Sequence, residues 1–301
     1  MSRQISPDWI AVDWGTTHLR AFAMGNGVLA SAHSADGMGT LEQSGFEPAL
    51  LSLIAPWLGT AIMPILCCGM VGARQGWAEA AYCAVPCAPL SADFTRVTTH
   101  DRRLNVHIIP GLKQNQPADV MRGEETQIAG FLALTPGFDG VLCLPGTHTK
   151  WVLLSAGEVV SFQTMMTGDM FAALSGHTVL RHSVNTPDWD NEAFKSALAD
   201  TLSRPESIAA RLFTLRAEGL LHGLSAASAR ARLSGLLIGA ELAATRPYWL
   251  GQRVALIGAE PLCALYATAL HAQGITALRT DGDATTLAGL IAAHTLLETT
   301  P

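Results

Sequence analysis

The amino-acid sequence predicts an α/β protein built from two similar lobes, each with a mixed β-sheet. Three observations lead to this fold class: a length of 301 residues, a strand-turn-strand pattern that occurs twice, and a mixture of strands and long helical segments elsewhere. A chain of this length favours about two domains. We therefore expect an N-terminal lobe at 1–135 and a C-terminal lobe at 136–301, with a final helix that packs back on the first lobe.

The first hairpin is predicted from period-two alternation of apolar residues. Its strands are WIAVDWG at 9–15, THLRAFAM at 17–24 and VLASAHS at 28–34, with Gly25-Asn26-Gly27 as the second turn. After the hairpin, FEPALLSLIAPWLG at 46–59 has helical spacing, and PILCCGM at 64–70 is typical of a buried strand. The first lobe is thus predicted to combine a sheet with at least one helix.

A second hairpin is predicted at 143–162, where CLPGTHTKWVLLSAGEVVSF matches residues 12–31 without a gap. Gly15 falls on Gly146, and Thr16 falls on Thr147. A repeat spacing of about 130 residues favours a duplicated domain over a solenoid, whose repeats run roughly 20 to 50 residues. The alternative is chance similarity between two hairpins.

Helices and one more strand are predicted around the second hairpin. They are the helices at 119–134, 231–244, 261–274 and 284–298, and the buried strand RVALIGA at 253–259. Asp283 is the predicted N-cap of the last helix. Two α/β lobes of this kind are expected to face each other across a cleft, where ligands commonly bind.

Composition limits the classes of function. The chain is 49% hydrophobic and 15% charged, which is typical of a compact enzyme, and its formal charge of −6 gives no basic surplus for nucleic acid. The first residues do not resemble a secretory signal, and no uncharged run reaches the roughly 18 to 20 residues that span a bilayer. We therefore expect a cytoplasmic protein without a nucleic-acid or membrane partner. The sequence does not decide whether the protein forms a homodimer, because the apolar helix predicted at 207–224 suits either a dimer interface or the core of one chain.

The six cysteines are interpreted as reduced, buried thiols, since a chain this long does not need a disulfide framework. Cys83 and Cys87 lie four residues apart, but no second pair or suitably spaced histidine follows. We therefore expect no zinc site.

The two Gly-Thr turns are the candidate phosphate site. Glycine permits close approach, and backbone amides and hydroxyls at such a turn form a nest for anions. A Mg²⁺ ion in front of Asp13 would then explain why a carboxylate stands at the end of a buried strand. The alternative for Asp13 is a turn cap bonded to the threonine amides.

The second turn is not equivalent, because Leu144 stands where the first has Asp13. Lys150 or His148 is a candidate to contact phosphate, although each is equally an exposed strand residue. A strand that ends at Gly258-Ala259 before a helix suits a backbone lying flat against adenine or ribose, and Gly239 and Glu241 are further ribose candidates. The residues assigned to nucleotide binding are Gly15, Thr16, Thr17, Arg20, Gly146, Thr147, His148, Lys150, Gly258 and Ala259.

With these stretches in place, the sequence resembles the sugar kinase, Hsp70 and actin superfamily of ATPases. Its phosphate-1, phosphate-2 and adenosine loops resemble VDWGTTHLR, PGTHTKW and LIGAEPL, and its second connecting helix resembles GDATTLAGLIAA. Within that superfamily the chain is similar to the 2-dehydro-3-deoxygalactonokinase family. The strings that carry this likeness are AVDWGTTHLRAF, CGMVGARQGWAEAAYCAVPC, VMRGEETQIAG, LPGTHTKWV and TMMTGDMFAALSGHTVL.

The resemblance implies a two-lobed actin-like ATPase fold, related to ribonuclease H. It implies a carbohydrate kinase that uses ATP and Mg²⁺ to phosphorylate the C6 hydroxyl of 2-dehydro-3-deoxy-D-galactonate. The alternatives are another sugar or sugar-acid kinase, a water-using polyphosphatase, or a non-catalytic actin-like switch protein. The preferred C4 epimer of the acceptor does not follow from the sequence.

The resemblance also implies a general base and an acceptor site. A carboxylate at the start of the helix before the second hairpin matches Glu124, ranked first, or Glu125, and Asp169 in TGDMF is the competing base. Simple helix capping is the alternative for the two glutamates. Arg74 and Arg122 are the candidates for the substrate carboxylate, since the planar guanidinium donates hydrogen bonds to two oxygens at once. Gln75 and Trp77 are candidates to bond or pack against the hydroxylated carbons.

Overall fold

The structure is a computed structural model that describes residues 5–299, and these form two compact units. Within the described residues, the first unit comprises 5–138, 155–161 and 282–299, and the second comprises Asp139–Leu154 and Phe162–Asp281. The predicted boundary between residues 135 and 136 lies close to the first crossing of the chain from one unit to the other. The final helix belongs to the first unit.

The first unit contains a six-stranded sheet in the order β3-β2-β1-β4-β7-β6. Its strands are β1 Trp9–Trp14, β2 Leu19–Met24, β3 Val28–Ser34, β4 Met63–Gly69, β6 Thr95–Arg96 and β7 Leu104–Ile108. β1 pairs antiparallel with β2 and parallel with β4. The predicted first hairpin and the predicted buried strand are therefore confirmed.

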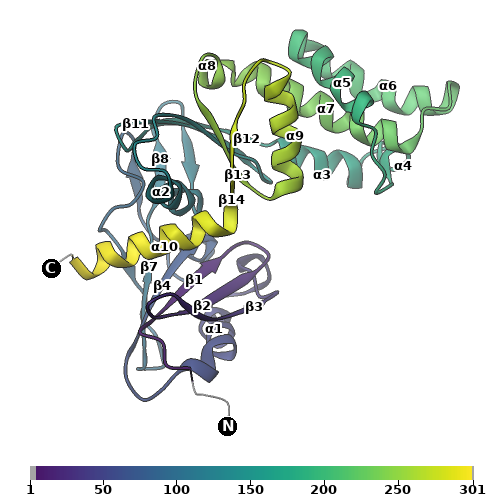
Figure 1. Cartoon of the computed structure of the whole chain (residues 1–301). Coiled ribbons are helices and arrows are strands. Elements are labelled where there is room, and N and C mark those ends of the chain that lie inside the picture. The colour runs from purple at the N-terminus through teal and green to yellow at the C-terminus, as the bar shows by residue number, and fades with distance from the viewer. Residues whose placement is uncertain (1–4, 300–301) are drawn as a thin grey trace. The chain divides into compact units, whose positions relative to one another are not determined.

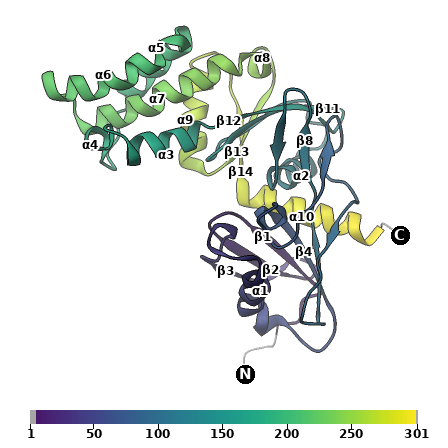
Figure 2. The same cartoon turned by 180° about the vertical axis from the view of Figure 1, so that it is seen from behind.

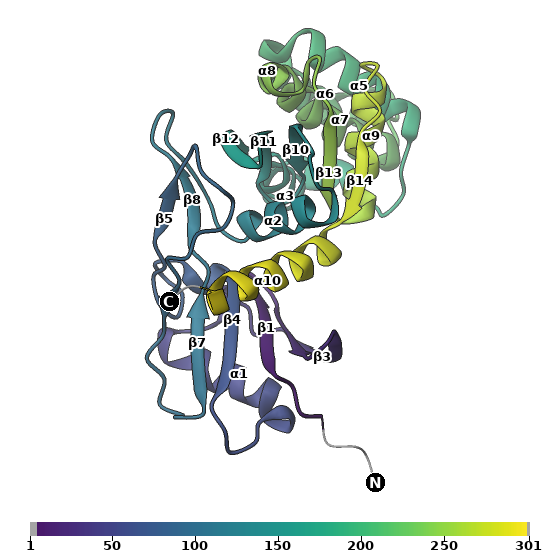
Figure 3. The ribbon, with the colours of Figure 1, turned by 60° about the vertical axis from the view of Figure 1, so that its left-hand side comes forward.

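Two helices cover the faces of this sheet. Alternate residues of a strand point to opposite faces, so Ile10 and Val12 pack in the core with α1 (Phe46–Ile54), and Trp9 and Ala11 pack with α10 (Gly282–Thr299). Figure 3 shows α10 running across β1 and β4. Asp13 continues the series of Trp9 and Ala11, which places it on the α10 side.

α10 also packs along α2 (Glu124–Leu134), as Figure 1 shows. The crossing depends on two glycines: a Cβ atom at Gly130 would overlap the carbonyl of Thr285, and one at Gly289 would overlap the carbonyl of Thr126. Close contact of two helix backbones needs small residues at the crossing point. This crossing fixes the start of α2 within the first unit.

Two helix starts differ from the sequence-based expectation. The helix expected at 119–134 begins only at Glu124, because 119–121 form strand β9 and Gly123 has a φ of 103°, which does not suit a helix. α10 begins at Gly282, so Asp283 lies in its first turn rather than at the N-cap. β9 (Asp119–Met121) joins β5 (Tyr82–Ala84) and β8 (Gly111–Gln114) in a separate three-stranded sheet.

The second unit has a sheet in the order β12-β11-β10-β13-β14, which repeats the order of the first five strands of the other sheet. Its strands are β10 Gly140–Leu144, β11 Thr149–Ser155, β12 Glu158–Met165, β13 Val254–Gly258 and β14 Leu278–Asp281. The central strand again pairs antiparallel with the next strand and parallel with a later one. The duplication predicted from the hairpins is confirmed.

The gap-free match of the two hairpins is wrong by one residue after the turn. Asp13 pairs with Arg20, whereas Leu144 pairs with Lys150, so the second turn is one residue shorter. Lys150, rather than Trp151, therefore occupies the place of Arg20. The cause is the turn itself, since a shorter loop shifts the pairing register of the strand after it.

Helices form the rest of the second unit. They are α3 Thr167–His177, α4 Arg181–Val184, α5 Asn191–Ser203, α6 Ile208–Leu221, α7 Ala226–Ala244, α8 Arg246–Trp249 and α9 Glu260–His271. Figure 2 shows α5 and α6 beside α7. Gly239 lies at the α5–α7 crossing, where a Cβ atom would stand 2.6 Å from the carbonyl oxygen of Leu198. The expected ribose contact of Gly239 is therefore wrong, because the glycine serves helix packing.

Short 3₁₀ helices complete the described chain: Met38–Thr40, Gln43–Gly45, Ala55–Trp57, Met70–Gly72 and Pro205–Ser207. The six cysteines are free thiols, of which Cys83 and Cys87 are half-buried and the others buried. α6 buries Leu215 and exposes Phe213, Leu220 and Leu221. Within residues 5–299, no helix has the length and apolarity needed to cross a membrane.

Candidate active site

Asp13 lies at the end of β1 and is bound to Arg20 on the neighbouring strand. Its Oδ2 atom accepts hydrogen bonds from the Arg20 guanidinium, with distances of 2.5 and 3.1 Å, and its Oδ1 atom lies 3.7 Å from the thiol sulfur of Cys68. The side chain is 20% exposed. Within residues 5–299, the hydrogen bonds to this carboxylate come from Arg20 and Cys68, and none comes from the amides of Thr16 or Thr17. The alternative role of Asp13 as a turn cap is therefore wrong.

Arg20 is held by two carboxylates. Besides Asp13, it binds Oδ1 of Asp283 on α10 at 2.5 Å. Burial disfavours the charged guanidinium, but the bonds to Asp283 and Asp13 outweigh this and raise the pKa of Arg20. Arg20 is thus fixed beside the Gly-Thr turn, and its predicted contact with nucleotide stays a prediction.

The first Gly-Thr turn has amide groups that the fold does not use. The carbonyls of Gly15 and Thr16 accept hydrogen bonds from the amides of Met38 and Gly39. In the described part of the chain, no acceptor is found for the amides of Thr16 and Thr17. This turn and Asp13 line a cavity of about 360 Å³. The arrangement is that of an anion nest.

The start of α2 brings two more carboxylates to this region. A Cβ atom on Gly123 would stand 3.4 Å from Cα of Gly69, and one on Gly69 would stand 3.6 Å from Oδ1 of Asp13. The ends of β1 and β4 and the start of α2 therefore converge. Glu124, half-buried, and Glu125, fully buried, lie in the first turn of α2.

The two glutamates differ in environment. Oε2 of Glu124 accepts a hydrogen bond from the amide of Arg122 at 3.0 Å. Glu125 accepts from the amide of Gly123 at 2.6 Å and from the hydroxyl of Thr126 at 2.9 Å. Burial, together with the charge of Glu124, raises the pKa of Glu125 to about 7. Glu125 thus bonds the amide of the N-cap residue Gly123, whereas Glu124 bonds an amide outside the helix, and the choice of base between them stays a prediction.

The raised pKa of Glu125 has a consequence for stability. Between the ordinary value of 4.5 and about 7 the folded state binds more protons than the unfolded state, so the free energy of unfolding falls as pH rises through this range. Glu125→Gln is expected to make the free energy of unfolding depend less steeply on pH. The difference should be clearest above about pH 6, because Glu241, whose pKa is raised to about 6, adds its own pH dependence below that value. Urea unfolding at several pH values measures the slope. Equal slopes in the two proteins would contradict the assignment.

Arg122 is buried, and two of its nitrogen atoms have no partner. Its NH2 atom donates to the carbonyl of Ala80 at 2.6 Å, and its guanidinium lies 4.3 Å from the centre of the Tyr82 ring. The Nε and NH1 atoms are buried without a hydrogen-bond partner in the described chain. Gly72 lies directly beside NH1, because a Cβ atom there would stand 2.8 Å from it. Arg122 thus lies against the glycine-rich segment 69–76.

The other predicted acceptor residues are placed less favourably. Arg74 is 81% exposed and lies 3.5 Å from a carboxylate oxygen of Glu79, and Gln75 is exposed. Trp77 is 7% exposed and packs in the core with Trp14 and Phe46. The core of the first unit accounts for the position of Trp77, and its expected substrate contact stays a prediction. The glycine-rich string GMVGARQGW at 69–77 does not tell a core tryptophan from one that faces a ligand.

In the second unit, α3 packs directly on the other Gly-Thr turn. A Cβ atom on Gly168 would overlap the carbonyl of Gly146, and the amide of Asp169 donates to the carbonyl of Thr147 at 2.9 Å. Asp169 Oδ2 lies 3.6 Å from Nε2 of His148, and both side chains are about half exposed. The structure thus joins Asp169 with the second turn, whereas Glu124 and Glu125 lie in the first unit.

Lys150 and Gly258 adjoin the same turn. Lys150 is 5% exposed, and its Nζ atom donates to the hydroxyl of Thr164 on β12 at 2.8 Å. The alternative prediction that Lys150 is an exposed strand residue is therefore wrong. Gly258 has a φ of 154°, and a Cβ atom there would stand 3.2 Å from the carbonyl oxygen of Pro145. Ala259 is the N-cap of α9. A strand-glycine-helix junction therefore lies against the turn, as predicted.

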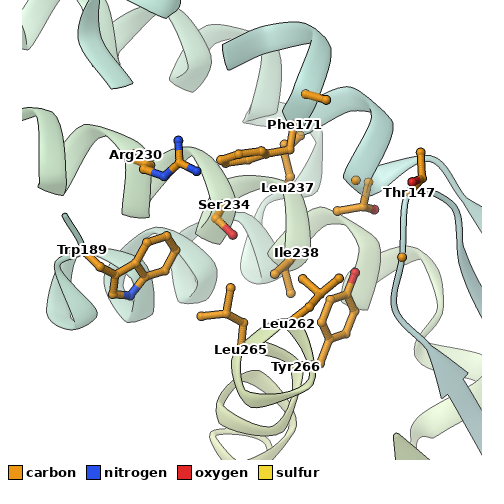
Figure 4. A pocket seen from close by; sticks show the side chains of 14 residues that line it. Thr147, Phe171, Trp189, Arg230, Ser234, Leu237, Ile238, Leu262, Leu265 and Tyr266 are labelled. Atoms are coloured by element: carbon orange, nitrogen blue, oxygen red, sulfur yellow. The ribbon is translucent and has the colours of Figure 1, made fainter. Parts of the chain in front are cut away.

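A cavity of about 380 Å³ opens beside the second turn, and Figure 4 shows the side chains around it. Gly146 and Thr147 lie at one end, and most of the wall is apolar. The remaining lining residues are Thr167, Gly168, Phe171, Ala172, Trp189, Arg230, Ser234, Leu237, Ile238, Leu262, Leu265 and Tyr266. A mostly apolar pocket with a few polar groups is typical of a small-molecule site.

Sequence reasoning missed most of this wall. Residues of α7 such as Arg230 and Ser234 have no local motif, and Phe171 and Trp189 follow no recognisable spacing. Leu262, Leu265 and Tyr266 could have been found, since they lie on the helix after the predicted adenosine loop. Glu241 is 1% exposed and bonded to three side chains of the interior, so its expected ribose contact is wrong.

Comparison with known proteins decides the family. The sequence model of the 2-keto-3-deoxy-galactonokinase family matches residues 13–293. The chain belongs to the 2-keto-3-deoxy-galactonokinase family. It is 34% identical over 286 residues to the 2-dehydro-3-deoxygalactonokinase of Escherichia coli, an alignment that covers 94% of this chain and 96% of that protein.

Two further relatives support membership of the 2-keto-3-deoxy-galactonokinase family. A probable 2-dehydro-3-deoxygalactonokinase of Rhizobium meliloti is 42% identical over 295 residues, covering 95% of this chain and 96% of that one. The crystal structure of a Sinorhizobium meliloti protein provisionally given the same name is 40% identical and has a TM-score of 0.90, covering 97% of this chain and 100% of that one. The chain is therefore a carbohydrate kinase, and the non-catalytic alternative loses its support.

The actin-like ATPase fold of this 2-keto-3-deoxy-galactonokinase family member is also confirmed. The activator of 2-hydroxyisocaproyl-CoA dehydratase from Clostridium difficile, solved with bound ADPNP, has a TM-score of 0.52 at 11% identity and covers 97% of this chain and 96% of that one. At this identity the likeness shows the fold alone. The reaction class follows from the kinase relatives, and the roles of single residues stay predictions.

Proposed function

We propose that this chain transfers the γ-phosphoryl group of ATP to the C6 hydroxyl of 2-dehydro-3-deoxy-D-galactonate, giving 2-dehydro-3-deoxy-6-phosphogalactonate and ADP. The names of the relatives support this reaction. The observation that carries an acidic acceptor is Arg122, a buried cation with two unpartnered nitrogen atoms. A buried charge without an ionic partner is costly, and a substrate carboxylate would supply that partner.

The acceptor assignment is tested by a coupled assay of ADP release. The substrates are the keto acid, its C4 epimer, and uncharged hexoses, with a reaction that lacks any acceptor as the control for ATP hydrolysis. The keto acid is expected to give the fastest turnover. Phosphorylation of an uncharged hexose at an equal rate would overturn the proposal. Equal ADP release without acceptor would instead favour the water-using polyphosphatase.

Arg122→Met is expected to raise KM for the keto acid by about ten- to a hundredfold, because a charge-assisted bond of roughly 1.5–3 kcal/mol is lost. KM for ATP should change little. Initial rates with each substrate varied in turn measure the two constants. Arg74→Met is the matched control, since Arg74 is the exposed arginine near the same glycine-rich segment. A larger change in the Arg74 variant would transfer the role to that residue.

We assign Mg²⁺ and phosphate binding to the first Gly-Thr turn. Mg²⁺ in kinases commonly binds one or two carboxylates together with substrate phosphates and water. Asp13 fits this role, since Arg20 binds its Oδ2 atom, whereas within residues 5–299 its Oδ1 atom is bonded only by the thiol of Cys68. Within the same residues, no group of three or more His, Cys, Asp or Glu side chains gathers to hold a metal, so phosphate and water would supply the other ligands. A bound Mg²⁺ would neutralise phosphate charge during transfer.

We assign the nucleoside to the cavity of the second unit. Its aromatic and aliphatic wall suits the faces of a base, and Gly146 and Thr147 lie at one end, where phosphate would begin. As in the first turn, no acceptor is found for the amides of Thr147 and His148 in the described residues.

The chemical step needs a base near the acceptor hydroxyl. We assign this role to Glu124, which is half-buried at the start of α2 and follows Arg122 by two residues. Glu124 would take the proton of the C6 hydroxyl as its oxygen attacks the γ-phosphorus and the bond to the ADP oxygen breaks. Glu125 and Asp169 are the competing bases.

A further inference from the structure

Glu241, on α7, is a buried carboxylate that the proposed reaction does not use. It is 1% exposed and accepts hydrogen bonds from three side chains. Nε1 of Trp151 and the hydroxyl of Tyr266 each donate at 2.8 Å, and the hydroxyl of Thr167 also donates to it. Tyr266 has a further bond of 3.0 Å to Thr149. These contacts form a closed polar network inside an otherwise apolar core.

The three donors come from three elements around the second Gly-Thr turn. Trp151 lies on β11, which follows the turn, Thr167 is the first residue of α3, and Tyr266 lies on α9. Thr167 and Tyr266 also line the cavity, and Figure 4 shows Tyr266 at its wall. A single carboxylate thus ties together the elements that surround the turn.

Thr167 links this network to the turn backbone. The next residue, Gly168, has no room for a Cβ atom against the carbonyl of Gly146, and the amide after it donates to the carbonyl of Thr147. A shift at the start of α3 would therefore move the turn. Since side-chain networks in a buried site hold their members to one geometry, loss of the Glu241 acceptor would loosen both.

A carboxylate suits this place because all three neighbours donate. One carboxylate has about four lone-pair sites, whereas an amide of the same shape offers only one acceptor oxygen. Burial raises the pKa of Glu241 to about 6, against the effect of the hydrogen bonds, so the group is mostly ionised at neutral pH. The network is therefore complete under ordinary conditions.

We propose that Glu241 is a positioning residue for the nucleotide: through Thr167 it holds the second Gly-Thr turn in the shape that binds ATP. This inference rests on the proposed assignment of the nucleoside to the cavity of the second unit. It differs from a role in packing alone, which would lower stability without changing the affinity for one particular substrate.

The test compares nucleotide affinity in Glu241→Gln and wild type. The variant keeps the size of the side chain, so it should fold, but its amide replaces an acceptor with a donor. We expect Kd for a non-hydrolysable ATP analogue, measured by titration calorimetry, to rise about tenfold, while KM for the keto acid stays within about twofold. Thr167→Val removes one donor and is expected to change Kd in the same direction.

Glu47→Gln is the matched control. Glu47 is also a buried carboxylate, 6% exposed, but it lies in the first unit and accepts hydrogen bonds from the amides of His100 and Asp101 at 2.9 and 2.6 Å. This variant should lower the melting temperature and leave nucleotide affinity unchanged.

Wild-type nucleotide affinity in folded Glu241→Gln would overturn the inference, as would an equal loss of affinity in Glu47→Gln. If Glu241→Gln does not fold, Thr167→Val decides by the same measurement. The proposed function is tested by a separate result. If the wild-type protein binds the analogue but phosphorylates no sugar acid, the proposed reaction is contradicted, whereas the comparison of nucleotide affinities still tests the role of Glu241.

Discussion

Asp13→Asn is expected to lower kcat by about a hundredfold or more. The substitution removes the negative charge that faces the proposed Mg²⁺, and phosphoryl transfer depends mainly on positioning and charge stabilisation. It also removes the carboxylate that orients Arg20 at 2.5 Å. Steady-state rates at saturating ATP, keto acid and Mg²⁺ measure kcat.

Asp283→Asn separates the two consequences of that change. Asp283 binds the same guanidinium at 2.5 Å, but its side chain is 71% exposed and it lies on α10. If the loss in Asp13→Asn comes from metal placement, Asp283→Asn should cost less than about fivefold, as expected for a largely exposed ion pair. Equal losses in the two variants would show that orientation of Arg20, not the metal, explains the role of Asp13.

Glu124→Gln is expected to lower kcat by about 10²- to 10⁴-fold, the contribution typical of a general base. The amide cannot accept the proton of the C6 hydroxyl, yet it keeps the size of the side chain. Affinity for a non-hydrolysable ATP analogue should remain near that of wild type, because the assigned role concerns the acceptor. Single-turnover rates, together with calorimetry, distinguish loss of chemistry from loss of binding.

Glu125→Gln and Asp169→Asn are the comparisons for that prediction. Near-normal turnover in Glu124→Gln would remove its assigned role, and the variant with the largest loss would then identify the base. Glu125 is a serious competitor, since its raised pKa of about 7 suits proton transfer near neutral pH. Asp169 instead lies beside His148 in the second unit.

Most of the fold could be predicted because its signals are local. Alternation in β1 to β3, the match of the second hairpin to the first, and the Gly-Thr turns all depend on residues close together in the sequence. The hairpins account for the β3-β2-β1 and β12-β11-β10 parts of the repeated strand order. The one-residue difference between the two turns was not visible, because a gap-free match of similar residues carries no information on pairing register.

The candidate site was predictable only in part. Glu124 and Glu125 are chemically identical neighbours, and only the packing of α2 shows that one is half-buried and the other fully buried. Arg122 and Arg74 were both candidates, and the glycines near Arg74 favoured it, whereas the structure buries Arg122 and exposes Arg74. The network of Glu241 joins residues 151, 167, 241 and 266, and contacts of such long range leave no local pattern.

The placement of α10 has a consequence for biosynthesis. Leu290 and Ala293 belong to the core that contains Trp9 and Ala11, and residues 282–299 group with the first unit. A ribosome completes every residue of the second unit before it releases this helix, so one face of the first sheet remains uncovered through most of translation. The nascent first unit therefore exposes an apolar face of its sheet until α10 is made, whereas the second unit already holds all its segments and can mature earlier.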